Sequence, residues 1–319
     1  MNEKFWNLFS DNYKENCLSW ARHPDNPIIP PGTKIWKSRW TANPHFLKLG
    51  GKLLLYYRGN GELPDRTGEL HDRIVAAEVL EIGHGRLKIR DLFENTVAVD
   101  CGKPGEFDAK EALDPAVTIY NGQIRLYYSA IGEDCPDSIG AAVSDDGINF
   151  TKLGQVMVGR APDVLVRDGK IHMIYQIADA DGKYLPYLAT STDGMNFKRE
   201  DQPVTGLMTK GGWSSLSIAT MRVFDAGEYV YMMYAGSSYL ADEPDYFGLA
   251  RSKDMINWEQ HPGNPIFGCN MKGSPDGGAI WGPALIETDD AFVLLYEGSA
   301  GKYNWDLDSQ LCMAWIKKP

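Results

Sequence analysis

A repeated pair of strands constrains the fold of this chain more than any other feature of the sequence. Each copy opens with a small residue or proline, runs through an apolar strand to a Gly or Asp turn, and continues into a second apolar strand ending in Tyr-Tyr or its equivalent. Five copies open at Asn43-Pro44, Asp114-Pro115, Ala161-Pro162, Ser217 and Gly282-Pro283. Recurrence at intervals of about 40 to 70 residues indicates a β-propeller with one copy per blade.

A second motif follows the middle copies and supplies two further strands to each blade. It occupies residues 139–150, 188–197 and 249–258, and each example turns through a polar Asp or Gly tip. The aromatic residue that ends the motif is expected to pin the fourth strand against its own blade. We therefore predict an all-β fold, a five-bladed β-propeller of four-stranded antiparallel blades, formed by residues 1–319 as a single domain.

The fifth copy ends near the C-terminus without a fourth strand. A replacement is present at the other end of the chain, because residues 20–28 (WARHPDNPI) closely parallel residues 258–266 (WEQHPGNPI) at the end of the fourth blade. We predict that this N-terminal strand completes the last blade and closes the ring, which removes exposed sheet edges. Residues 1–16 are then a capping extension.

Composition excludes several classes of function. A net charge of −11 opposes nucleic-acid binding, and no apolar run approaches the ~18 residues of a membrane helix. The five cysteines show neither a disulfide pattern nor metal-ligand spacing, so no metal and no cofactor are predicted. The N-terminus lacks a secretory h-region, and a cytoplasmic location is expected. The 9 Trp, 16 Tyr and 11 Phe suit both a propeller core and the flat surfaces on which sugars stack.

Catalytic candidates come from the openings of the repeats, because the first strand of every blade lines the central channel. Asp114, Glu111 and Asp163 are the carboxylates at these positions. Glycosidic cleavage needs a carboxylic acid to protonate the leaving oxygen, and direct hydrolysis needs a second carboxylate. A turn-capping role for Asp114 is the alternative, and Asp163, one residue beyond its proline, also suits a position inside the blade.

Substrate-binding candidates share the same end of the channel. Basic side chains can hold phosphate or sugar hydroxyls and indoles can stack on sugar rings, although solvated surface and core are the alternative places for these residue types. The candidates are Trp40, Asn43, Arg58, Arg160, Lys210, Trp213 and Trp281. His71 and Asp72 are expected in a loop that overhangs the channel mouth.

The repeat as a whole resembles the five-bladed glycosidase superfamily that includes glycoside hydrolase families 32, 43, 62 and 130. The segments that carry the likeness look most like family 130, the β-mannoside phosphorylases and related mannosidases. These segments are Asn26-Pro27-Ile28-Ile29-Pro30, Trp36, Asn43-Pro44, Leu54-Leu55-Tyr56-Tyr57-Arg58, Glu111-Ala112-Leu113-Asp114-Pro115 and Tyr296-Glu297-Gly298-Ser299-Ala300.

The resemblance implies an inverting enzyme that acts on a β-mannoside or similar glycoside, with Asp114 as the proton donor and inorganic phosphate or water as the nucleophile. A family 130 phosphorylase also carries a basic cluster for phosphate, which Arg160, Lys210 and Arg222 match approximately. In families 32 and 43 the carboxylate of the first blade is nucleophile or base, and here that position is Asn43, which cannot do this. A family 43-like arabinofuranosidase or xylosidase and a non-catalytic sugar-binding propeller remain the alternatives.

Overall fold

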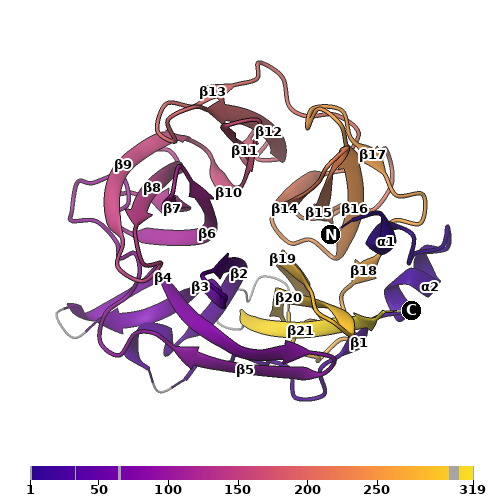
Figure 1. The fold of residues 1–319 in the computed structure, drawn as a ribbon, viewed down its shortest axis with the longest axis horizontal. Coiled ribbons are helices and arrows are strands. Elements are labelled where there is room, and N and C mark those ends of the chain that lie inside the picture. The colour runs from indigo at the N-terminus through magenta and orange to yellow at the C-terminus, as the bar shows by residue number, and fades with distance from the viewer. Residues whose placement is uncertain (1, 33, 64–65, 302–308, 319) are drawn as a thin grey trace.

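Five antiparallel sheets surround a common axis in the computed structural model, which describes all residues except 1, 33, 64–65, 302–308 and 319 (Figure 1). The prediction of a five-bladed β-propeller is confirmed. The innermost strands are β2 (Trp40–Leu49), β6 (Glu111–Tyr120), β10 (Arg160–Arg167), β14 (Ser217–Ala226) and β19 (Ala279–Glu287).

Each blade continues outward from its innermost strand through hairpin connections. Blade one adds β3 (Lys52–Leu63), β4 (Arg66–Gly83) and β5 (Arg86–Asp91), and blade two adds β7 (Gln123–Ile131), β8 (Ser138–Ser144) and β9 (Thr151–Val158). Blade three adds β11 (Lys170–Ala178), β12 (Tyr184–Ser191) and β13 (Lys198–Arg199). Blade four adds β15 (Tyr229–Ser237), β16 (Tyr246–Ser252) and β17 (Glu259–Gln260), with β18 (Phe267–Gly268) also paired to β16.

The last blade contains strands from both ends of the chain, as predicted. After β19 it continues through β20 (Ala291–Ser299) and β21 (Gln310–Lys317), and β1 (Ala21–Arg22) pairs antiparallel with β21 as the outer strand. The side chain of Asn26 bonds the backbone N–H and C=O of Met313, both at 2.9 Å. Asn264 bonds Leu249 in the same way at 2.8 and 2.9 Å. The two sequence-similar segments therefore make the same contacts in neighbouring blades.

The N-terminal residues form two short helices beside the last two blades (Figure 1). They are α1 (Glu3–Trp6) and α2 (Tyr13–Leu18), and a 3-10 turn, η1 (Ile35–Lys37), precedes β2. Phe5 is fully buried and packs edge-on against Phe292 of β20, with 4.9 Å between ring centroids. Burial of aromatic rings fastens this segment to the ring of blades. No helix among the described residues is long and apolar enough to cross a bilayer.

The polar tips between the third and fourth strands join neighbouring blades. In blade two, Asp146 accepts hydrogen bonds from two backbone N–H groups of its own turn at 2.8 Å, and blades three and four repeat this turn. The Tyr56 hydroxyl of blade one donates to the Gly147 carbonyl at 2.6 Å, and Phe150 packs edge-on against Tyr56. The aromatic residue thus contacts the preceding blade, whereas the sequence had suggested a contact within its own blade.

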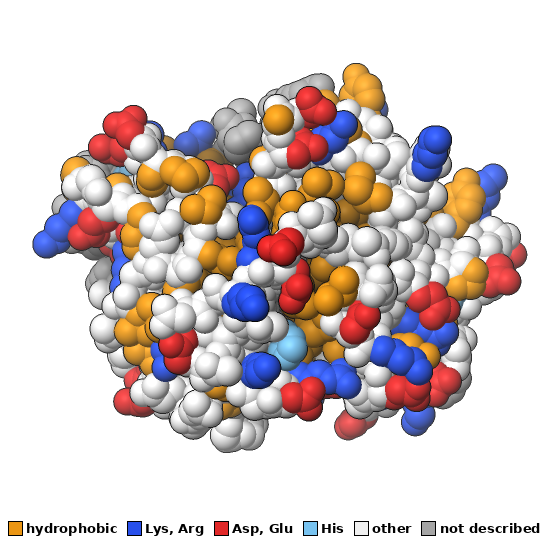
Figure 2. Space-filling view, turned by 90° about the horizontal axis from the view of Figure 1, so that it is seen from above, with side chains coloured by type: hydrophobic (Ala, Val, Ile, Leu, Met, Phe, Trp, Pro, Cys, Tyr) orange, Lys and Arg blue, Asp and Glu red, His pale blue; other side chains and the backbone are white. Residues whose placement is uncertain are grey.

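The outer wall of the propeller carries mixed charge. Figure 2 shows Lys and Arg side chains beside Asp and Glu, with hydrophobic side chains between them. On the face shown, positive charge does not gather into the separate basic area that binds nucleic acid through its phosphates.

Candidate active site

A β-bulge interrupts the pairing of each innermost strand at the same position of the repeat. In four blades the bulged residue precedes proline and has positive φ: Asn43 (46°), Asp114 (52°), Ala161 (48°) and Gly282 (57°). Blade four has no proline at this position, and Ala219 does not share the positive φ. For a residue other than glycine this conformation costs about 1–3 kcal/mol, so the surrounding structure must hold it. Bulges commonly re-aim side chains beside active sites.

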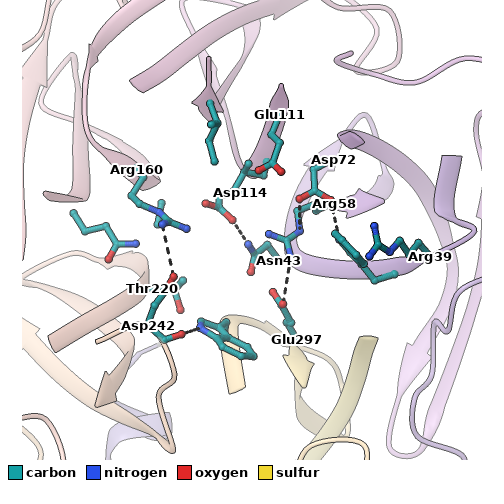
Figure 3. Close-up of a pocket in the computed structure, with 16 residues that line it drawn as sticks. Arg39, Asn43, Arg58, Asp72, Glu111, Asp114, Arg160, Thr220, Asp242 and Glu297 are labelled. Atoms are coloured by element: carbon teal, nitrogen blue, oxygen red, sulfur yellow. Dashed lines mark hydrogen bonds and ion pairs between the residues drawn. The ribbon is translucent and has the colours of Figure 1, made fainter. Parts of the chain in front are cut away.

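The bulges border a cavity of about 430 Å³ on the propeller axis (Figure 3). Side chains from all five blades line it, as expected for the blade openings. The lining residues are Arg39, Trp40, Asn43, Arg58, Asp72, Glu111, Leu113, Asp114, Ile131, Arg160, Ala161, Gln176, Thr220, Asp242, Trp281 and Glu297. This size is within the range of small-molecule sites, roughly 300–1,000 Å³.

Asp114 extends from its bulge into this cavity and is 3% exposed. Its Oδ1 accepts a hydrogen bond from the side-chain amide of Asn43, the equivalent residue of blade one. The Asn43 Oδ1 atom is buried without a hydrogen-bond partner among the described residues. The amide therefore fixes the direction of one carboxylate through its N–H group, while its own oxygen is buried.

Two glutamates beside Asp114 have raised pKa values. Burial raises the pKa of Glu111 to about 7, and the negative charge of Asp72 adds to the increase. Burial also raises the pKa of Glu297 to about 7, while Arg58 and the Ser309 hydroxyl oppose the change. Carboxyls that titrate near neutral pH suit general acid–base catalysis.

The cavity holds five carboxylates and three arginines, and two of the arginines are paired with carboxylates. Arg58 lies 3.6 Å from Asp72 and 3.5 Å from Glu297. Arg160 lies 3.6 Å from Asp242, and its guanidinium donates to the Tyr184 hydroxyl at 2.9 Å. Both arginines, predicted at the channel mouth, lie in the lining of the cavity, but much of their positive charge is already neutralised.

Two indoles form walls of the cavity, held by hydrogen bonds at their N–H groups. Trp40 donates to Asp72 Oδ1 at 2.7 Å, and Trp281 donates to the Asp242 carbonyl at 3.0 Å. Both tryptophans are nearly buried. Their fixed rings can bound a sugar face without further ordering of the side chain.

Three predicted site residues lie outside the cavity lining. Asp163 is 1% exposed and lies 3.1 Å from His45, because it follows the bulge instead of occupying it. Lys210 is exposed on the loop before β14. Trp213 packs against Tyr234, with 5.2 Å between ring centroids, in the core of blade four. A ligand in the cavity would therefore not contact Asp163, which is buried, or Lys210, which is exposed on a loop. It would not contact Trp213 either, which packs in the core of blade four.

The sequence contained a signal for two lining residues that were missed. Arg58 pairs across β2–β3 with the residue before the bulge, and Gln176 and Glu297 occupy the same position in blades three and five. Once Arg58 is assigned to the site, the repeat alone predicts the other two. Asp72, expected in an overhanging loop, lies in β4 and is 2% exposed. Asp242 comes from the β15–β16 loop, which follows no repeat.

The arrangement can transfer protons and bind a polar ring. Its carboxylates supply acid and base, its arginines and amides supply donors, and its indoles supply apolar faces. Within the described part of the chain, no group of three or more His, Cys, Asp or Glu side chains is placed to hold a metal ion.

Comparison with known proteins gives relatives in fold. No protein-family model matches the sequence. A segment of 50 residues is 40% identical to a β-xylosidase of Bacillus subtilis (strain 168), and it spans 15% of this chain and 9% of that protein. The β-1,2-mannobiose phosphorylase from Listeria innocua matches with a TM-score of 0.65 and 13% identity over 93% of this chain and 96% of its own.

A second solved structure comes from the GH130 family of mannoside phosphorylases, described as containing glycoside hydrolases that target β-1,2 mannosidic linkages in Candida mannan. It matches with a TM-score of 0.64 and 17% identity over 93% of both chains. At these identities the likeness concerns the fold. This protein therefore has the five-bladed β-propeller fold of the mannoside phosphorylases and glycosidases that its repeats resemble.

Proposed function

We propose that this protein cleaves a glycosidic bond with inversion in the axial cavity, with a β-mannoside or similar glycoside as substrate and Asp114 as general acid. The observation that carries the proposal is the position of Asp114. It projects from a strained bulge into a cavity of about 430 Å³, oriented by Asn43. The folds of mannoside phosphorylases and hydrolases support the class of substrate.

In this mechanism Asp114 donates its proton to the leaving oxygen as the bond between that oxygen and the anomeric carbon breaks. A water molecule attacks the anomeric carbon from the opposite face and gives its proton to a carboxylate base. We assign the base to Glu111, whose pKa of about 7 makes it about half ionised at neutral pH and largely ionised in alkaline solution. Its carboxylate has no hydrogen bond or ion pair among the described residues, whereas Glu297 is held by Ser309 and Arg58.

The charge of the cavity favours water over inorganic phosphate as nucleophile. A phosphorylase must bind a dianion, which requires cationic side chains free to contact it. Arg58 and Arg160 are each engaged by carboxylates, and Lys210 lies outside the lining. Among the described residues, this leaves Arg39, which lies over the Trp40 ring, as the one lining arginine not paired with a carboxylate, and a single guanidinium is little for a dianion. Phosphate is the co-substrate in the competing version of this proposal.

Product analysis decides between the two nucleophiles. The protein is incubated with β-1,2-mannobiose and with a panel of aryl glycosides, with and without inorganic phosphate. We expect free sugar at the same rate in both conditions. Sugar 1-phosphate formed only when phosphate is present would assign phosphorolysis instead.

Replacement of the acid tests the assignment of Asp114. Asp114→Asn preserves the shape of the side chain but removes its acidic proton. Turnover of β-1,2-mannobiose is expected to fall by about 10²–10⁴-fold, the usual contribution of a general acid. Circular dichroism and the melting temperature check that the variant is folded. Unchanged turnover in a folded variant would remove Asp114 from the mechanism.

A xylosidase or arabinofuranosidase is the second candidate function, because the matched segment of a β-xylosidase favours it. Such an enzyme would need a base other than Asn43, and Glu111 or Glu297 is then the nearest substitute in the cavity lining. Nitrophenyl xylosides and arabinofuranosides in the same panel distinguish this function. Binding of oligosaccharides without turnover of any substrate would instead indicate a sugar-binding propeller.

A further inference from the structure

Arg222 breaks the pattern of the repeat in β14, the innermost strand of blade four. It occupies the third position after the bulged residue of blade four and is 4% exposed. The equivalent residues of the other blades are apolar: Phe46, Val117, Val164 and Leu285. A buried charge is costly, so a guanidinium in an apolar repeat position calls for a specific role.

The contacts of Arg222 lead to the two bulges that carry the acid and its partner. Its Nη2 donates to the carbonyl of Pro44 at 3.2 Å and makes a longer contact of 3.5 Å with the carbonyl of Pro115. These prolines directly follow Asn43 and Asp114. One nitrogen therefore bridges the bulges of blades one and two, although Arg222 itself belongs to blade four.

Nη1 of the guanidinium is held from its own blade and from blade three. Nη1 donates to the Met221 carbonyl at 3.0 Å and lies 3.8 Å from Asp163. Asp163 also accepts the backbone N–H of Val223 at 2.6 Å and lies 3.1 Å from His45 Nε2. Burial lowers the pKa of His45, which favours a neutral imidazole that donates to Asp163. The predicted catalytic residue Asp163 thus becomes the counter-ion of the arginine.

We propose that Arg222 is a positioning residue that holds the bulges of blades one and two together, so that Asn43 stays hydrogen-bonded to Asp114. The inference rests on the proposed function of Asp114. Asn43 and Asp114 both have positive φ, and strained backbone of this kind persists only where the surroundings hold it. Arg222 supplies part of that restraint by fixing the carbonyl next to each strained residue.

The expected defect is specific to steps that need the acid. Arg222→Met keeps a long side chain but loses the donors to both carbonyls, and Asp114 is then less well aimed at the leaving oxygen. A poor leaving group such as a sugar hydroxyl depends on protonation, whereas dinitrophenolate departs without it. For β-1,2-mannobiose, kcat is expected to fall by about 10²-fold with KM little changed, as for a misplaced catalytic group. For dinitrophenyl β-mannoside, kcat is expected to change little.

Four variants separate positioning from a general loss of structure. Arg222→Lys retains the positive charge and a single donor nitrogen, and it is expected to recover part of kcat. Asp114→Asn should show the same dependence on the leaving group as Arg222→Met. The double variant of Arg222→Met and Asp114→Asn should lose no more kcat than Asp114→Asn alone, because both substitutions act on one proton transfer. Arg22→Lys is the matched control, because Arg22, in the outer strand of blade five, forms an ion pair with buried Asp276. Arg22→Lys should lower the melting temperature, and any effect on kcat should be the same for both leaving groups.

The outcomes are distinguishable from failure of the proposed function. If Asp114→Asn shows the leaving-group dependence and Arg222→Met does not, the positioning role is wrong although Asp114 remains the acid. If Asp114→Asn leaves all turnover unchanged, the proposed function itself is wrong.

A crystal structure of Arg222→Met tests the inference without relying on turnover. The inference predicts that the bulge at residue 43 or 114 relaxes and that the hydrogen bond between Asn43 and Asp114 is lost. Unchanged bulges with this hydrogen bond intact would overturn the positioning role.

Discussion

Replacing Glu297 with glutamine is expected to change how stability depends on pH. Glu297 is 4% exposed, and its pKa rises from 4.5 to about 7 on folding. A carboxyl with a raised folded-state pKa gives a stability contribution that is fully present below the unfolded pKa and is lost as the pH rises through the folded pKa. Between pH 5 and pH 8 this linkage amounts to a loss of about 2 kcal/mol.

Glutamine cannot ionise, so the variant lacks this component. Urea denaturation followed by tryptophan fluorescence at pH 5, 6, 7 and 8 gives the free energy of unfolding of both proteins. The value for the wild type minus that for Glu297→Gln is expected to fall by about 2 kcal/mol across this range. Exposed Glu133, replaced by glutamine, is the control. A difference that stays constant, or grows with pH, would show that Arg58 and Ser309 stabilise the carboxylate at least as much as burial penalises it.

Three further predictions concern the base, the bulge and the closure of the ring. With Glu111 as base and a pKa of about 7, the pH profile of kcat/KM should show an inflection near pH 7, and Glu111→Gln should lower kcat/KM by about 10²-fold or more and remove that inflection; a pH profile from 5 to 9 checks both. Gly282 has a φ of +57°, and a Cβ added in Gly282→Ala would lie 3.1 Å from Asn43 Cα. Thermal denaturation should therefore show a loss of about 1–3 kcal/mol in the free energy of unfolding, together with lower turnover. A fully stable variant would contradict the packing at the bulge. Deletion of residues 1–22 removes β1 and exposes the edge of β21, so the melting temperature should fall and size-exclusion chromatography should show more self-association than for the full chain.

The fold could be predicted from the sequence because each level of the pattern agrees with the others. The five blade openings, their hairpins and the closing strand all rest on residues that recur at equivalent positions, such as Asn26 and Asn264. Each strand buries side chains at a fixed place in its repeat, so the requirement for an apolar residue at that place recurs in all five blades.

The site was predictable only where it follows the repeat. Asp114 and Asn43 occupy the bulge, whereas Asp163 belongs to the next position along the strand and is buried. Both Asp114 and Asp163 are next to a proline in the sequence, so that neighbour could not distinguish them. The side chain that turns toward the axis is determined by which residue forms the bulge. Asp242 could not be predicted at all, because its loop follows no repeat and its place depends on contacts such as that with Trp281.

The central claim is that Asp114 protonates a glycosidic oxygen bound in the axial cavity. The most direct measurement is a crystal structure of Asp114→Asn soaked with β-1,2-mannobiose. We expect a disaccharide that spans the cavity with its glycosidic oxygen about 2.6–3.2 Å from the side chain of residue 114. A disaccharide bound with that oxygen out of reach of residue 114, or bound outside the cavity, would contradict it.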